Sequence, residues 1–159
     1  MIIIAFFVLA VILSSLIEYW AHRSMHTFPW FGSLTSHYKH HYEESFGVLQ
    51  DFKSYSQAAL VFCPLFFVSW SAGIGAILGG LAFAAFAAYT HQLQHEHPAQ
   101  CFWMKVPVHY LHHKYSCRCN YGLSIDVWDR VFGTYRPQQW LTDDKFNSPR
   151  HSKTQVVKL

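Results

Sequence analysis

Ten of the twelve histidines in the chain fall into four clusters, arranged as two similar halves. Each half has a His-x-x-x-His pair followed by a His-x-x-His-His triplet. Imidazole is the commonest metal-binding side chain and suits iron, copper, nickel and zinc. The pattern predicts a polynuclear metal site, and the candidate ligands are His22, His26, His37, His40, His41, His91, His95, His109, His112 and His113.

The spacing within the clusters suits ligands that are carried on helices. Residues four apart lie on one helical face, so His22 and His26 can reach one ion, as can His91 and His95. The last two histidines of a triplet lie about 100° apart around a helix of 3.6 residues per turn. A triplet can therefore spread its rings between two neighbouring ions. Ten histidines are too many for one four-coordinate ion and suit two ions that keep open positions.

Composition favours a membrane protein with a single domain over residues 1–159. The chain is 52% hydrophobic and only 13% charged, about half the charge of a soluble protein. Its net charge of +3 is too small to indicate a nucleic-acid partner. The four cysteines show no zinc-site spacing, which favours free thiols in a reducing compartment. For Cys117 and Cys119 we favour ordinary loop thiols over a role as metal ligands.

Two uncharged runs predict membrane helices. Met1–Ile17 has no basic segment ahead of it, so we expect a retained transmembrane helix rather than a signal peptide, continuing past the lipid through His26. Ala58–Thr90 would be about 50 Å long as one helix, which exceeds the bilayer core. We therefore expect a break within Ser69–Gly75 and a hairpin of two short helices. The small residues of this run allow close helix packing and could shape a lipid slot.

All twelve lysines and arginines lie at or after Arg23, and none lies between Ser54 and Met104. The histidines and the basic residues therefore share one side of the membrane, which the positive-inside tendency makes the cytoplasm. The predicted fold class is all-α: one N-terminal span, a short helical hairpin, and a cytosolic helical cap that carries the histidines. We expect turns at Pro29–Gly32 and Asn120–Gly122, with the triplets on helices.

Carboxylates near the clusters are candidate partners for the second nitrogen of each imidazole. Glu18 stands four residues before His22, where it can orient that ring or simply mark the membrane edge. Asp126 and Asp129 can serve the second half or pair with nearby arginines. His97 could replace His95, but Pro98 favours His95. We expect His151 to be solvated in the polar tail, residues 141–159.

The boxes resemble those of the fatty acid hydroxylase / sterol desaturase superfamily of membrane di-iron enzymes. The resemblance covers about residues 18–137, which would form the catalytic region. It is carried by Glu18–His26, His37–His41, His91–His95, His109–His113, and Asn120–Gly122 with Trp128–Thr134.

The resemblance implies an enzyme that uses two irons, O2 and two electrons to attack a C–H bond of a lipid. Its ten clustered histidines would bind the irons, with no catalytic residues beyond them. We expect hydroxylation of a fatty acyl chain, with a sterol or carotenoid as the alternative substrate and desaturation as the alternative outcome. His97-Pro98 is not followed by the glycine pair of a haem-binding cytochrome b5, so electrons would come from a separate donor of ferredoxin or cytochrome b5 type.

Other classes fit the pattern less well. A zinc-dependent membrane hydrolase is disfavoured because His91–His95 lacks the glutamate of His-Glu-x-x-His. A metal-ion binding or transport protein is disfavoured because neither apolar run contains an acidic or basic side chain. Ferritin-like di-iron proteins use glutamate ligands, and a bis-histidine haem protein would place its ligands within the apolar helices.

Overall fold

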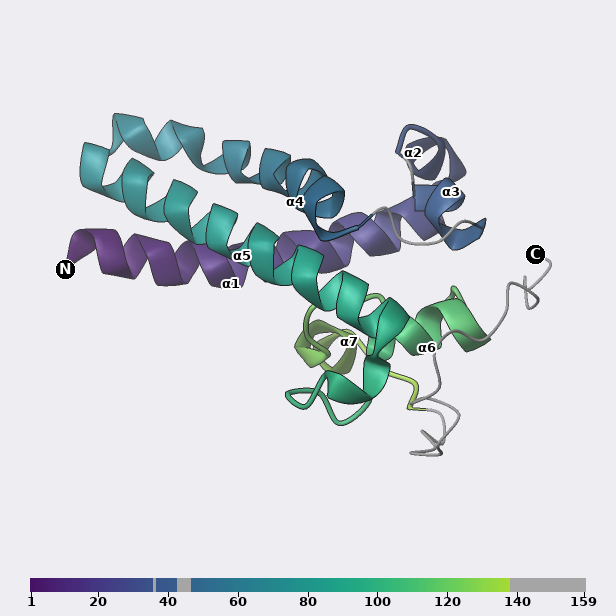
Figure 1. Ribbon diagram of the computed structural model, residues 1–159. Helices are drawn as coiled ribbons and strands as arrows, with labels where there is room; N and C mark the ends of the chain where they lie inside the picture. Colours follow the sequence, from purple (N-terminus) through teal and green to yellow (C-terminus); the bar gives the residue numbers. More distant parts are fainter. Residues whose placement is uncertain (36, 43–46, 138–159) are drawn as a thin grey trace.

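The computed structural model describes residues 1–35, 37–42 and 47–137, apart from the side chain of Tyr42, and every regular element among them is helical. Figure 1 shows a bundle of three long segments with shorter helices gathered at one end. The elements in chain order are α1 (Ile2–Thr27), α2 (Pro29–Ser33), α3 (His37–Tyr42), α4 (Val48–Ser56), the 3-10 helix η1 (Gln57–Phe67), α5 (Trp70–Glu96), the 3-10 turn η2 (Pro98–Gln100), α6 (Val108–Tyr115) and α7 (Val127–Val131).

Helices α1 and α5 lie side by side and run in the same direction (Figure 1). Two glycines one turn apart on α5 allow this contact. A Cβ on Gly75 would lie 2.4 Å from the Ile3 carbonyl oxygen, and one on Gly79 would lie 2.3 Å from that of Phe7. Small residues at this spacing let two helix backbones touch, as in membrane helix pairs. The expected close packing is confirmed at Gly79, whereas Gly75 was expected to lie in a break of the helix.

The segment α4–η1 runs back along α5 and completes the predicted hairpin (Figure 1). The chain turns at Val68–Ser69, and the Ser69 hydroxyl accepts the Ala72 N–H at 3.1 Å, which starts α5. The expectation of two short arms is wrong for the second arm, because α5 is 27 residues long. Gly73 and Gly75 do not break it, since their missing side chains admit Phe66 and α1.

Helices α1 and α5 are both long and apolar enough to cross a membrane. The first continues through His26, as predicted, and ends at Thr27. Because η1 leads away from the histidine end and α5 returns to it, both histidine halves lie at the same end of the bundle. The described residues therefore form an all-helical fold, with the clustered histidines gathered at one end of the apolar helices.

Shorter elements carry the remaining histidines. Both triplets are helical, on α3 and α6, as predicted. The predicted turn at Pro29–Gly32 is instead the short helix α2, since proline is well tolerated in a first helical turn. Asn120 has a φ of 59°, a left-handed conformation that asparagine tolerates. The turn predicted at Asn120–Gly122 instead lies at residues 117–118, because hydrogen bonds to Arg136 and Asp129 hold residues 120–122 in place. His151 and the polar tail lie outside the described residues.

Candidate metal centre

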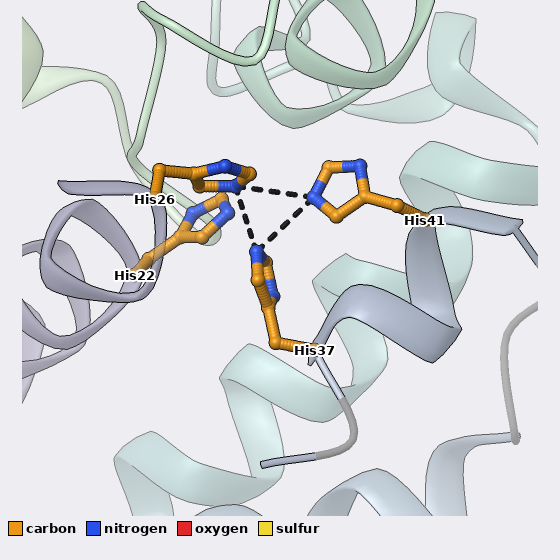
Figure 2. A group of neighbouring side chains, drawn as sticks. All are labelled: His22, His26, His37 and His41. Atoms are coloured by element: carbon orange, nitrogen blue, oxygen red, sulfur yellow. Dashed lines mark hydrogen bonds between the residues drawn. The ribbon is translucent and has the colours of Figure 1, made fainter. Parts of the chain in front are cut away.

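Five histidines from three helices converge on one point, and we name them cluster A: His22, His26, His37, His41 and His112. Figure 2 shows the Nε2 atoms of three of them facing one another. The His26 Nε2 lies 2.7 Å from that of His37 and 3.1 Å from that of His41, and the last two are 3.1 Å apart. The His112 Nε2 lies 2.9 Å from the same His26 atom.

The contacts of the His26 Nε2 cannot all be hydrogen bonds. A neutral imidazole nitrogen either donates one proton or accepts one, yet this atom has three imidazole nitrogens within 3.1 Å. Two ligands about 2.1 Å from a metal and at right angles to each other lie about 3 Å apart, which matches these separations. The Nε2 of His22 is also buried without a hydrogen-bond partner. The geometry of cluster A therefore fits a shared cation.

Five other histidines form cluster B: His40, His91, His95, His109 and His113. The His40 Nε2 lies 2.8 Å from that of His91 and 3.2 Å from that of His95, and the last two are 3.3 Å apart. Both ring nitrogens of His109 are buried without a hydrogen-bond partner, as is the Nε2 of His113. Cluster B thus has the same converging geometry and the same unsatisfied donor set as cluster A.

The middle histidine of each triplet crosses to the other cluster. His37 and His41 lie in cluster A while His40 lies in cluster B, and His112 lies in cluster A between two histidines that belong to cluster B. This follows from helix geometry, because residues four apart share a face and the residue between them diverges by about 100° from the last. The two clusters touch, since the rings of His41 and His113 stack with centroids 4.1 Å apart.

The rings on the short helices are in the form that binds metal. Burial and neighbouring imidazoles hold the pKa of His109, His112 and His113 well below the ordinary value. Burial also lowers the pKa of His41 to about 4. These rings are therefore neutral at pH 7, with a lone pair for a cation.

The Nδ1 atoms of several cluster histidines have oxygen partners on the side away from the cluster. His91 pairs with the Asp51 carboxylate at 2.7 Å, and both side chains are buried. Metal-binding histidines usually donate their second N–H to such a partner, which sets the tautomer and the ring orientation. The sequence reasoning missed Asp51 because it lies on α4, 40 positions from His91. The His22 and His112 rings instead face the carbonyl oxygens of Tyr121 and Cys119, at 2.6 and 2.8 Å.

Glu18 and Asp129 hold the loop between α6 and α7, which supplies those carbonyls. Glu18 accepts the Leu123 N–H at 2.6 Å and the hydroxyl of Ser124, so its hydrogen bonds go to this loop rather than to His22. Asp129 accepts the Tyr121 and Gly122 N–H groups and the Thr134 hydroxyl, each at 2.7 Å.

The remaining sequence candidates are also placed. Asp126 pairs with Arg130 at 2.7 Å, which was one of the two predicted roles. His97 is exposed at the end of α5, whereas His95 lies in cluster B. Gln94, which the sequence reasoning missed, is fully buried and accepts the His109 N–H at 2.9 Å, so it fixes the start of α6 against α5.

A cavity of about 250 Å³ runs from the clusters into the apolar bundle. It reaches from the level of Met25 on α1 back to that of Ser14, which is about 16 Å of helix rise. Five histidines of both clusters line it: His22, His37, His40, His91 and His109. Small and apolar side chains of α1, η1 and α5 form most of the remaining wall, including Ala59, Gly80 and Ala84. The two clusters therefore share an apolar chamber.

The profile of the fatty acid hydroxylase family matches residues 7–134, which include all ten clustered histidines. The chain belongs to the fatty acid hydroxylase family. No curated protein and no solved structure matches the chain. Fatty acid hydroxylases are membrane-bound di-iron oxidoreductases with histidine boxes, and this protein is an oxidoreductase of that kind. Its two clusters of imidazole nitrogens are suited to two metal ions, and its two long apolar helices agree with a membrane location.

Proposed function

We propose that this fatty acid hydroxylase family member inserts oxygen into a C–H bond of a fatty acyl chain, with one iron in each histidine cluster. The observation that carries the proposal is the shared chamber: both clusters line the same narrow apolar cavity. An acyl chain lying in it would bring one methylene group to both metals. Irons bound there would supply the activation of O2, and the ten histidines would be their protein ligands.

The proposed reaction converts R–H, O2, two electrons and two protons into R–OH and water. The chain's own residues contribute binding and orientation. Ile17, Ala21 and Phe83 line the chamber and exclude water from the reacting carbon. The buried Asp51 carboxylate holds the His91 ring through its Nδ1, which keeps the Nε2 lone pair toward cluster B.

We further propose that the histidine end faces the cytoplasm and that a separate one-electron carrier of ferredoxin or cytochrome b5 type supplies the electrons. The support for the orientation is the distribution of charge. All lysines and arginines lie outside α1's apolar part and the η1–α5 hairpin, at or after Arg23. We also propose that the whole chain acts as a single domain.

The test is lipid analysis of cells with and without the gene, supplied with labelled O2. The proposal predicts a new hydroxylated acyl chain that carries one labelled oxygen atom. The Ala84→Phe variant should lose most of this product while keeping its iron, because the new ring would fill the cavity. A changed sterol or carotenoid with unchanged acyl chains would instead assign the alternative substrate. Unlabelled product, or stoichiometric zinc without iron, would overturn the proposal in favour of a hydrolase.

A further inference from the structure

The segment that follows α6 lies against cluster A and provides a row of acceptors. Three alternate residues of this segment each face the Nδ1 atom of a different cluster A histidine. The contacts are Cys117 Sγ to His41 at 3.7 Å, the Cys119 carbonyl oxygen to His112 at 2.8 Å, and the Tyr121 carbonyl oxygen to His22 at 2.6 Å. One loop therefore orients three of the five rings.

Only one of these three acceptors belongs to a side chain. The carbonyl oxygens of Cys119 and Tyr121 remain when their side chains are changed, whereas the sulfur of Cys117 does not. The thiol of Cys119 points elsewhere, because its Sγ donates to the Ser116 carbonyl at 3.7 Å. The loop thus contains two cysteines in nearly the same place, one with a sulfur on a cluster histidine and one without.

We propose that Cys117 is a positioning residue for His41. Its sulfur accepts the Nδ1–H of His41 and so keeps the opposite nitrogen, Nε2, aimed at the point shared with His26 and His37. The inference rests on the proposed function, because that function makes cluster A an iron site. It adds that the iron in cluster A, but not the one in cluster B, depends on a thiol.

The position of Cys117 makes this dependence open to experiment. Its side chain is half-buried beside His41 and also lies close to His112, so a small reagent can reach it. In cluster B the Nδ1 partner of His91 is the carboxylate of Asp51, which does not react with thiol-alkylating agents under the same conditions. Loss of the Cys117 acceptor should therefore weaken one metal and leave the other unchanged.

The experiment measures iron release from the full-length protein loaded with ⁵⁷Fe, comparing Cys117→Ala, Cys117→Ser and the control Cys119→Ala. Cys117→Ala should release one of two irons to a chelator about tenfold faster or more, and should change one of two Mössbauer components. Cys117→Ser should recover most of the retention, because a hydroxyl also accepts a hydrogen bond. Cys119→Ala should behave as wild type.

Three results would overturn the inference: unchanged release in Cys117→Ala, equal release in Cys119→Ala, or equal changes in both iron components. If Cys117→Ala does not fold, iodoacetamide is applied to folded Cys63→Ser, Cys119→Ser protein, in which Cys101 is buried. The added carbamidomethyl group has no room beside His41 and must move the sulfur away from its Nδ1, so alkylation should release the same single iron. Full retention would reject the inference. A wild-type protein that holds no iron refutes the proposed function itself, whereas one that holds iron insensitive to Cys117 refutes only this inference.

Discussion

Clusters A and B contain five histidines each, but their outer partners differ in charge. In cluster A the oxygen partners of His22 and His112 are neutral backbone carbonyls of one loop. In cluster B the partner of His91 is the buried carboxylate of Asp51. A carboxylate on a ligand ring makes that ring more basic and offsets the charge of a bound cation. Two sites with the same ligands should therefore differ in affinity, with the metal in cluster B held more tightly.

The largest expected effect tests how the triplets are divided between the clusters. His40→Ala should remove the iron of cluster B, and His37→Ala that of cluster A, although both residues lie on α3. Each variant should fall from about two irons per chain to about one and lose hydroxylation, because a two-metal site needs both ions. Mössbauer spectra of ⁵⁷Fe protein should lose a different component in each case. Loss of the same component in both would show that the division is wrong.

A smaller effect is expected when the Asp51 carboxylate, the charged outer partner of cluster B, is removed. Asp51→Ala should lower the iron affinity of cluster B by about 10- to 100-fold, because His91 loses the partner that orients it. Asp51→Asn should lose less, since an amide oxygen still accepts the N–H. Chelator competition measures both, with Asp126→Asn as a control at the exposed Arg130 pair. Iron loss from cluster A in the Asp51 variants would contradict the account.

The smallest effect concerns the loop between α6 and α7, whose carbonyl oxygens face His22 and His112 of cluster A. A Cβ on Gly122 would lie 2.2 Å from the Ile125 carbonyl oxygen, so Gly122→Ala must shift this loop. We expect a loss of about 1–3 kcal/mol in stability and weaker iron retention in cluster A alone. Gly133→Ala is the matched control, because Gly133 has open space and a φ of 70°, and strain there costs about 1–2 kcal/mol. Equal iron retention by cluster A in the two variants, at similar losses of thermal stability, would argue against a special role for this loop.

The sequence predicted the ligand clusters better than their surroundings. Helical spacing placed His22 with His26 and predicted that each triplet would serve two ions, because these relations are local to one helix. The structure groups the side chains in this way, with His40 and His112 in the opposite cluster from their triplet neighbours. The Asp51–His91 pair was not predictable, since it joins two helices through a contact with no sequence period. The prediction that Glu18 orients His22 was wrong, since its hydrogen bonds go to Leu123 and Ser124, which only the folded loop brings near.

The fold follows a similar division between local and long-range information. The apolar runs predicted the helices, and the even number of crossings between the halves was expected from the shared site. The length of α5 was not predicted, because glycines such as Gly73 and Gly75 disfavour a helix. In this fold their missing side chains allow contact with η1 and α1. A glycine that breaks a helix and one that admits a neighbouring helix look the same in a single sequence.

The most direct test of the central claim is the metal content of purified wild-type protein together with its ⁵⁷Fe Mössbauer spectrum. Two adjacent clusters with unequal outer partners predict about two irons per chain, little zinc, and two distinct iron components. One metal per chain, or stoichiometric zinc with no iron, would contradict the claim that the two histidine clusters form a pair of iron sites.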